Sequence, residues 1–332
     1  MKKVAVAVLN WNGRDLLKRF IPDLIKYSPE ATIYVIDNAS TDDSVTLLKT
    51  VFPSVKCIQL SSNLGYAGGY NLGLKQINEE ILVLLNSDVA VTPNWLLAFL
   101  SRFDEDERVG ILQPKIKDLK NPTYFEYAGA AGGYIDQLGY PFCKGRIFNT
   151  LEKDEGQYNS NYPIFWASGA CLVVRNNLFK HLGGFDEDYF AHQEEIDFCW
   201  RAQLQGFLVE YCYQSEVYHL GGATLASANP KKTFLNFRNS LYNLLKNQSL
   251  PQALITIFIR MILDGLAGIQ FLIKGKINHF KAILQAHFSF YKNFNHINKK
   301  RKTIRHTQQV KPSNFSIVYK YFVQKKKKFN QL

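Results

Sequence analysis

The stretch that most constrains the fold is ILVLLNSDVAV, at residues 81–91. Its first five residues are all apolar, which is typical of a strand buried on both faces in a parallel sheet. The run then ends in Asn86-Ser87-Asp88, and ligands of open α/β sheets bind just outside the carboxyl ends of strands. A carboxylate at this point suits a hard cation that keeps water and substrate phosphates as its other ligands. These residues leave a second interpretation open, in which Asp88 only caps the next helix.

Two earlier segments follow the same order of elements. Residues 4–10 predict a buried strand, residues 14–27 have apolar side chains at helical spacing, and residues 32–36 predict a second strand that ends in Asp37-Asn38. This βαβ order predicts a right-handed crossover and a parallel sheet. An acid at the end of the second strand can accept hydrogen bonds from a nucleotide, although Asp-Asn also makes ordinary turns.

A glycine-rich segment, NLGYAGGYNLG at residues 63–73, lets the backbone approach a ligand or bend sharply. The first strand is followed by NWNGRD and not by GxGxxG, so a nicotinamide dehydrogenase is a remote option. Residues 117–162 show no regular pattern, and long irregular stretches inside a domain tend to be functional or mobile. Trp166, in the following FWASGACLVVR, suits either stacking on a sugar ring or a place in the core.

Acidic residues also gather at the start of a later helix. In GGFDEDYFAHQEEIDFCWRAQLQGF the helical spacing begins at Glu194, so Glu194 and Glu195 lie at its amino end. The helix dipole favours anions there, which is one explanation. The other is a carboxylate held at a cleft as a general base. His219 follows the next strand; a lone His is usually structural, but near a carboxylate site it becomes a candidate metal ligand.

The charge is unevenly distributed along the chain, whose formal net charge is +12. Residues 231–332 contain 20 Lys and Arg against one acid, Asp264, whereas residues 1–230 contain 20 against 27. This asymmetry predicts a basic part that faces an anionic partner. Five cysteines without a CxxC motif indicate reduced thiols in a cytosolic chain. The apolar run at residues 4–9 is too short for the core of a signal peptide.

The basic part begins with a strongly apolar segment, residues 250–275, which Arg260 and Asp264 interrupt. We expect amphipathic helices that lie in a membrane interface, anchored by the basic tail. A helical pack against the catalytic domain and a hairpin that enters the bilayer are the alternatives. Nucleic acid is disfavoured, since the aromatic residues belong to long apolar helices and not to a basic groove. The expected regions are a catalytic domain at 1–245, membrane-associating helices at 246–295 and a basic tail at 296–332.

Five motifs occur in a specific order: VLNWNG, VIDNASTDDS, NLGYAGGYNLG, LLNSDV and GGFDEDYFAHQEEIDFCWR. Over residues 3–245 the chain therefore resembles the inverting family 2 glycosyltransferases, and most closely the bacterial rhamnosyltransferase-like branch that builds surface polysaccharides. The resemblance implies an α/β fold of the GT-A type, with a Rossmann-like, mostly parallel sheet flanked by helices. The amphipathic, basic helical extension would follow this domain.

The resemblance also implies roles for single residues. It assigns Glu195 as the general base; because the family usually has Asp at this second position, Glu194 and Asp197 remain alternatives. A divalent cation, Mg²⁺ or Mn²⁺, would bind Asp88 and His219, and Trp166 and His192 would lie on the acceptor side. The nucleotide and donor sugar would contact Asn10, Asn12, Asp37, Asn38, Ser40, Asn63, Gly65, Asn71 and Ser87.

The expected activity is transfer of a deoxyhexose such as rhamnose, or a hexose, from a nucleotide-diphosphate donor. The acceptor would be a hydroxyl of a lipid-linked or growing surface saccharide, reached by a metal-assisted single displacement that inverts the anomeric centre. The enzyme would work as a peripheral protein on the cytoplasmic face of the inner membrane, bound to its anionic surface and without nucleic acid. A sugar nucleotidyltransferase would need a more basic loop than NWNGRD. A non-catalytic, membrane-bound carbohydrate-binding protein would not need Asp88, Glu195 and His219.

Overall fold

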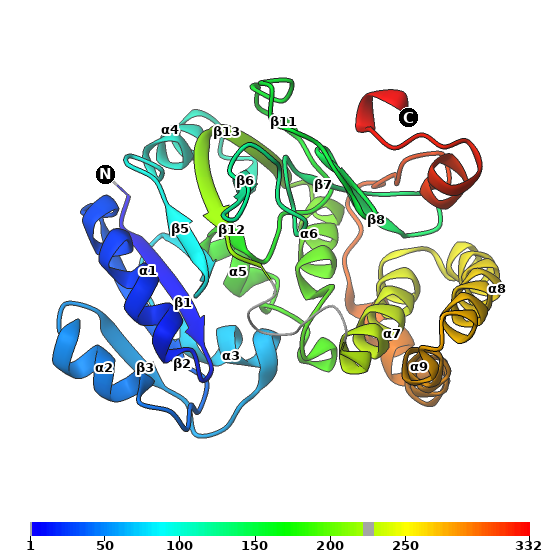
Figure 1. Cartoon of the computed structure of the whole chain (residues 1–332), viewed down its shortest axis with the longest axis horizontal. Coiled ribbons are helices and arrows are strands. Elements are labelled where there is room, and N and C mark those ends of the chain that lie inside the picture. Colours follow the sequence, from blue (N-terminus) through cyan, green and yellow to red (C-terminus); the bar gives the residue numbers. More distant parts are fainter. Residues whose placement is uncertain (1, 222–228) are drawn as a thin grey trace.

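The central sheet contains nine strands. The computed structural model describes residues 2–221 and 229–332 and orders the strands β11-β13-β6-β12-β4-β1-β2-β3, with β5 paired to β13 (Figure 1). Strands β3, β2, β1 and β4 are parallel neighbours, and β6 is parallel to β13. Strand β12 runs antiparallel between β4 and β6, and β5 and β11 are antiparallel to β13. The bounds are β1 Val4–Asn10, β2 Ala31–Asp37, β3 Lys56–Gln59, β4 Ile81–Asn86, β5 Val89–Val91, β6 Val109–Asp118, β11 Tyr162–Pro163, β12 Cys171–Arg175 and β13 Leu208–His219. The predicted, mostly parallel α/β sheet is confirmed.

Helices cover both faces of this sheet because side chains alternate between the faces along each strand. From β1, Val4, Val6 and Val8 pack on the side of α1 (Arg14–Tyr27), α2 (Ser44–Val51) and α4 (Leu97–Glu105). Ala5 and Ala7 face α3 (Gly65–Leu74), α5 (Asn176–His181) and α6 (Glu194–Leu204). Each fully buried aliphatic side chain contributes about 1.5–3 kcal/mol. The result is a layer of helices on each side of the sheet (Figure 1).

The glycine-rich segment forms α3 and serves packing. A Cβ added at Gly73 would lie 2.5 Å from Ile36 Cδ1, and one at Gly69 would lie 2.9 Å from Leu9 Cδ1. The glycines therefore let the helix lie close against β1 and β2. The sequence predicted that this segment lets the backbone approach a ligand or bend sharply. At Gly69 and Gly73 the close approach is that of the helix to the sheet.

A small antiparallel sheet occupies the region that showed no pattern in the sequence. It consists of β7 (Gly133–Ile135), β8 (Pro141–Cys143), β9 (Arg146–Ile147) and β10 (Thr150–Leu151). The C-terminal tail, with short helices at Tyr319–Val323 and Phe329–Gln331, returns to cover it. Ile317 is fully buried with Phe142 and Ile147. The buried Asp136 carboxylate accepts hydrogen bonds from the backbone N–H of Leu138, Tyr140 and Ile317.

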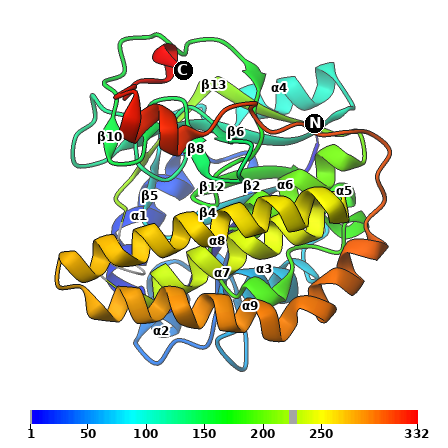
Figure 2. The ribbon, with the colours of Figure 1, turned by 90° about the vertical axis from the view of Figure 1, so that its right-hand side faces the viewer.

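Three long helices form the outer layer on the other side of the small sheet: α7 (Pro230–Asn247), α8 (Leu250–Ile273) and α9 (Ile277–Thr303). Figure 2 shows α8 and α9 side by side, with α7 behind them. The expected boundary at residue 245 falls in the last turn of α7, and the one at residue 295 falls inside α9. The basic tail is folded onto the catalytic domain through residues such as Ile317.

By length and composition, α8 is sufficient to cross a membrane. Its two charged residues, however, point into the protein. Arg260 donates to the carbonyl of Leu138 and to Ser240 Oγ, and its guanidinium lies 3.7 Å from the Tyr140 ring centre. Asp264 is 1% exposed, and its carboxylate lies 3.2 Å from His287 Nε2. Arg260 and Asp264, which interrupt the apolar segment in the sequence, therefore form the inner, polar face of a helix that lies along the domain.

Replacing Asp136 with Ala tests how firmly the tail is attached. The change leaves the buried N–H of Ile317 and the partly buried N–H groups of Leu138 and Tyr140 without their acceptor. An unsatisfied buried donor costs about 1–3 kcal/mol. We expect Asp136→Ala to lower the free energy of unfolding by at least about 2 kcal/mol in urea titrations. Asp15→Ala, at a side chain that is 90% exposed, is the control and should change it by less than about 0.5 kcal/mol.

Candidate functional site

The ends of β1 and β2 carry a hydrogen-bonded polar network. Asn10 Nδ2 donates to Asp37 Oδ1 over 3.1 Å and to Ser40 Oγ over 3.2 Å, and the Ser40 N–H donates to Asp37 Oδ2. Asn12, at φ 51°, accepts from the Thr41 N–H. The parallel register pairs Asn10 with Asp37, so both side chains emerge at one edge of the sheet. Four of the residues predicted for the nucleotide are thus brought together.

A second cluster joins the end of β2 to the start of α3. Asn38 donates to Asn63 Oδ1 and to the Gly65 carbonyl, and Asn63 in turn accepts from the Gly65 N–H. Gly65 itself has φ 71°, and a Cβ there would lie 2.4 Å from the Phe190 carbonyl oxygen. Gly65 is therefore required where the loop of residues 190–193 crosses α3.

Asp88 and His219 meet at the same edge of the sheet. Strand β13 pairs antiparallel with β5, so His219 lies opposite Val89, and the Leu220 N–H donates to the Asp88 carbonyl. His219 Nε2 lies 3.1 Å from Asp88 Oδ1, and both residues are buried. Although 131 residues apart in the sequence, the two predicted metal ligands are in contact.

A third residue completes this group. Glu126 Oε1 lies 3.3 Å from His219 Nδ1, on the opposite side of the imidazole from Asp88. Burial lowers the pKa of His219, but the hydrogen bond with Asp88 and the nearby Glu126 carboxylate outweigh it and raise the pKa to about 10. Glu126 lies in the irregular stretch, where no spacing marked it. The only indication in the sequence was that Glu126 lies in a long irregular stretch, and such stretches tend to be functional or mobile.

The residues present fit a divalent cation that shares its coordination with a substrate. Asp88 and His219 provide one carboxylate and one imidazole, donors that Mn²⁺ and Mg²⁺ accept. Residues 2–221 and 229–332 contain no group of three or more His, Cys, Asp or Glu arranged to hold a metal by themselves. A cation bound here would take its remaining ligands from water or substrate phosphates, as expected for Mg²⁺.

Glu194 and Glu195 are presented by an unusual turn. Phe190, His192 and Gln193 all have positive φ, between 63° and 74°, immediately before α6. The Phe190 carbonyl accepts from the N–H groups of Tyr66 and Ala67 at the start of α3. Positive φ in non-glycine residues is costly and persists only where neighbouring contacts enforce it. Contacts with neighbouring segments therefore hold the turn in this conformation, and the turn fixes the position of the start of α6.

Helix α7 supplies most of those contacts. Asn239 donates to the carbonyls of Tyr189, Ala191 and His192, and Asn243 donates to the Gln193 carbonyl. Asn239, Asn243 and Asn247 are spaced by four and so lie on one helix face. The sequence did not predict this contact; the missed signal is the four-residue spacing of Asn in FRNSLYNLLKN, residues 237–247, inside an apolar helix.

Burial shifts the ionisation of these side chains. It raises the pKa of Glu195 to about 7 and that of Glu194 well above its ordinary value, which the neighbouring Glu195 charge raises further. One oxygen of each carboxylate is buried without a hydrogen-bond partner among the described residues. Burial, and then the charge of Lys232, lowers the pKa of His192 to about 4, so this imidazole is neutral at pH 7. A carboxylate that titrates near pH 7 is suited to act as a general base.

The metal-side and base-side groups share one neighbourhood. Cys199, one turn along α6 from Glu195, accepts a hydrogen bond from the Ala167 N–H. The adjacent Ser168 donates to the carbonyl of Ala128, whose own N–H donates to the Glu126 carboxylate. The start of α6 is thus linked through residues 167–168 to the segment that carries Glu126.

Three predicted residues are engaged elsewhere. Trp166 is 4% exposed, belongs to the core and donates its indole N–H to the Tyr134 carbonyl, so it offers no face to an acceptor. Asn71 exchanges hydrogen bonds with the Phe185 backbone and holds the segment before α6. Asp197 is fully buried in ion pairs with Arg201 and Lys246, which excludes it as the base. Ser87 is half-buried next to Asp88.

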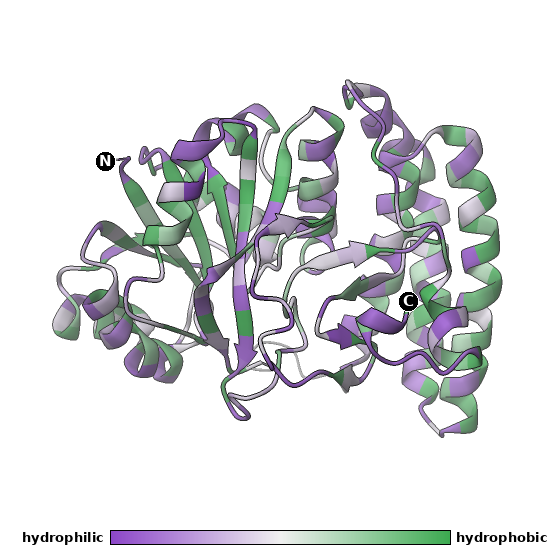
Figure 3. Cartoon of the chain, turned by 90° about the horizontal axis from the view of Figure 1, so that it is seen from above, coloured by the Kyte–Doolittle hydropathy of each residue, from purple (hydrophilic) through white to green (hydrophobic). Residues whose placement is uncertain are grey.

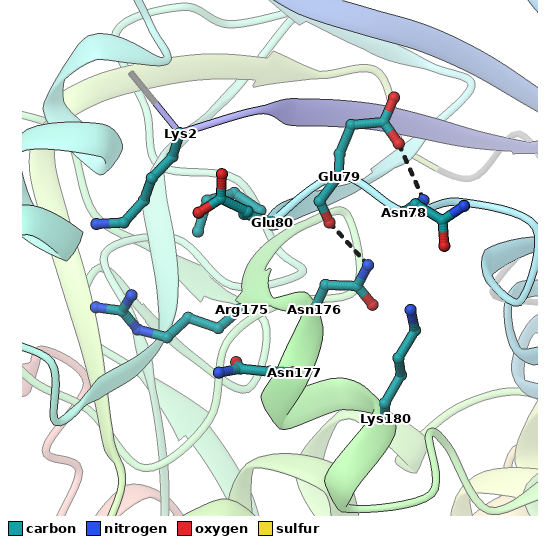
Figure 4. A pocket seen from close by; sticks show the side chains of 9 residues that line it. Lys2, Asn78, Glu79, Glu80, Arg175, Asn176, Asn177 and Lys180 are labelled. Carbon is teal, nitrogen blue, oxygen red and sulfur yellow. Dashed lines mark hydrogen bonds between the residues drawn. The ribbon is translucent and has the colours of Figure 1, made fainter.

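A separate pocket of about 300 Å³ lies at the opposite edge of the sheet (Figure 4). Lys2, Glu80, Arg175 and Lys180 line it, near the amino ends of β1 and β4. The Arg175 guanidinium is held by the carbonyls of Phe103, Asp106 and Val109. The pocket contains none of the predicted site residues.

Comparison with known proteins identifies the family. Residues 5–183, more than half of the chain, match "Glycosyl transferase family 2". The chain belongs to this family. The N-acetylglucosaminyl-diphospho-decaprenol L-rhamnosyltransferase of Mycobacterium tuberculosis is 30% identical over 230 residues, covering 64% of this chain and 75% of that protein. The rhamnosyltransferase WbbL of Escherichia coli K12 is 23% identical over 217 residues, covering 63% and 80%. The predicted rhamnosyltransferase-like branch is confirmed, and the chain is a glycosyltransferase.

A solved structure supports the fold. The mannosyltransferase PcManGT from Pyrobaculum calidifontis, in complex with GDP-Man and Mn²⁺, superimposes with a TM-score of 0.53. The alignment covers 91% of this chain and 84% of that one, at 14% sequence identity. The predicted GT-A fold is confirmed.

Glu195 gives this glycosyltransferase a testable dependence of stability on pH. Its pKa rises from an ordinary 4.5 to about 7 in the folded state, so the folded protein holds more protons than the unfolded chain between these values. Stability due to this group is lost as pH rises through that window. We expect Glu195→Gln to become more stable relative to wild type between pH 4.5 and 7, and to hold that advantage above pH 7.

Urea unfolding at pH 5, 6, 7 and 8 measures the difference. Glu155→Gln, at an exposed side chain, controls for the chemistry of the substitution. A stability difference between wild type and Glu195→Gln that stays constant over this range would contradict the assigned environment of Glu195.

Proposed function

We propose that the protein is an inverting glycosyltransferase. It moves a deoxyhexose, such as rhamnose, or a hexose from a nucleotide-diphosphate donor. The acceptor is a hydroxyl of a lipid-linked or growing surface saccharide. The observation that carries the proposal is the contact between Asp88 and His219 at the carboxyl edge of the sheet, where the Asn10–Asp37 network also lies. Glu195, at the start of α6, supplies a further carboxylate. One carboxylate–imidazole pair and one buried carboxylate provide what a direct displacement needs. The relative in M. tuberculosis is named for a diphospho-decaprenol-linked saccharide and for rhamnosyl transfer, which supports this substrate class.

Each group of site residues would have a separate role in the reaction. Asn10, Asp37 and Ser40 would receive the nucleoside through the open side of their network. A divalent cation held by Asp88 and His219 would act as a Lewis acid that neutralises charge on the leaving phosphate. Glu126 would keep the His219 ring oriented through Nδ1, as carboxylates next to metal-binding histidines do.

Glu195 would act on the acceptor. A sugar hydroxyl is a weak nucleophile, and a positioned carboxylate that accepts its proton in the transition state contributes about 10²–10⁴-fold. The raised pKa of Glu195 suits it to accept that proton near pH 7. A single displacement with one base inverts the anomeric centre. Glu194 is buried beside it and keeps the local charge low when protonated.

A membrane surface would bring this site to a lipid-linked acceptor. The outward face of α8 exposes apolar side chains at helical spacing, among them Ile255 (65%), Phe258 (69%) and Ile273 (80%). Figures 2 and 3 show α8 and α9 as the outermost layer, with apolar residues along it. Basic residues beyond the end of α8, Lys274 and Lys276, are exposed and suit anionic headgroups. An apolar face with a basic margin is typical of a helix that lies in a bilayer interface.

The first test is activity. The donor is identified by thermal shift against a panel of nucleotide sugars with Mn²⁺ or Mg²⁺, because a true donor stabilises the fold by mass action. With that donor, we expect Asp88→Ala to remove most transfer, and Glu195→Gln to lower kcat by about 10²–10⁴-fold. Circular dichroism confirms that each variant is folded. Near-normal turnover by either variant would overturn the role assigned to that residue.

The second test is membrane binding. We expect the double variant Ile255→Ser/Phe258→Ser to lose most of its co-sedimentation with vesicles that contain anionic phospholipid. Transfer to a water-soluble acceptor should be unchanged, since these exposed side chains lie on the outward face of α8. Leu72→Ser, at an exposed apolar residue on α3, is the matched control. Unchanged vesicle binding by the double variant would contradict the proposed membrane surface on α8.

A further inference from the structure

Among the residues that the structure describes, one buried cation has no ionic partner. Five Lys and Arg residues are less than 9% exposed in residues 2–221 and 229–332: Lys115, Arg146, Arg201, Lys246 and Arg260. Four of them have a carboxylate oxygen within 4 Å. Arg146, on β9, has none among the described residues, and residues 222–228 contain no Asp or Glu.

The neighbours of Arg146 do not neutralise it. Nη2 lies 3.5 Å from the Cys143 sulfur, the guanidinium lies 4.5 Å from the centre of the Tyr127 ring, and Nε is buried without a hydrogen-bond partner. Burying an unpaired charge is costly, and replacing such charges with apolar groups often stabilises a protein. The charge is therefore better explained by a ligand than by the stability of the fold.

The guanidinium of Arg146 lies close to the protein surface. The Tyr127 ring against which it packs is 49% exposed. Tyr127 directly follows Glu126 in the chain, and Gly145, next to Arg146, packs against Phe125, which directly precedes Glu126. Arg146 therefore borders the site built above.

We propose that Arg146 binds a diphosphate group of a substrate. The planar guanidinium fork matches phosphate oxygens in a bidentate way, and an anion would supply the missing ionic partner. The inference rests on the proposed function, in which the donor and a lipid-linked acceptor both contain a diphosphate. The location favours the acceptor. The small sheet that carries Arg146 contacts α8 through Leu138 and Tyr140, toward the proposed membrane face.

Direct binding tests the inference without requiring transfer. Geranyl diphosphate, with geraniol as the uncharged control, is titrated calorimetrically in EDTA, and UDP is titrated with Mn²⁺. We expect Arg146→Met to weaken binding of geranyl diphosphate at least tenfold and to leave UDP binding unchanged. If Arg146→Met weakens UDP binding instead, the diphosphate site holds and belongs to the donor. Unchanged affinity for both probes, or wild-type binding of geraniol as tight as of geranyl diphosphate, overturns the proposal.

Stability provides a second readout. Without ligand, Arg146→Met should melt at or above the wild-type Tm, because it removes an unpaired buried charge. Arg102→Met is the matched control: it breaks a bidentate pair with Glu210 away from the site, so it should lower the Tm and leave both affinities unchanged. If Arg146→Met does not fold, Arg146→Lys replaces it. This variant keeps the charge without the fork and should still weaken geranyl diphosphate binding several-fold; unchanged binding counts against the proposal.

Discussion

The geometry of the site depends on a polar network between α7 and the segment that leads into α6. Lys246 bridges Asp186 and Asp197 at 2.6 and 3.0 Å, and Asn247 donates to Asp197. Nearer the start of α7, Asn239 holds three carbonyls of the turn before Glu194. Buried polar groups are costly unless all their hydrogen bonds are made, so such a network specifies one arrangement of the two helices. The acid that we assign as the base is therefore positioned by a helix outside the family match.

This dependence explains why the C-terminal helices do not form a separable unit. Helix α7 touches the site on one side and packs against α8 and α9 on the other. Helix α8 turns Arg260 and Asp264 inward toward the small sheet and presents its apolar side chains outward. The tail closes the far side of that sheet through Asp136 and Ile317. A surface proposed to meet a membrane and a site proposed to act on a lipid-linked acceptor are thus parts of one packed body.

The same packing separates two kinds of buried charge. Arg201 and Lys246 are paired with carboxylates that hold the segment before α6. Arg146, Glu195 and the His219 group are only partly matched by their neighbours. A substrate, a cation or a transferred proton can supply the partner that such a charged group lacks. Groups with shifted pKa values of this kind cluster at functional sites.

The sequence by itself determined the first buried strands, their parallel arrangement, and the polar residues at the carboxyl edge of the sheet. These follow from local patterns: apolar runs that end in Asn10, Asp37 and Asp88 emerge at one edge because parallel strands share their direction. The sequence also identified Glu195 and His219, through motifs and not through geometry. Only the tertiary structure decided which remaining polar residues face the site. Asn71, Trp166 and Asp197 carry the right chemistry but are used for packing, whereas Glu126 and Arg146 come from a stretch without periodicity. Their positions depend on contacts between segments far apart in the chain, and no local pattern encodes those contacts.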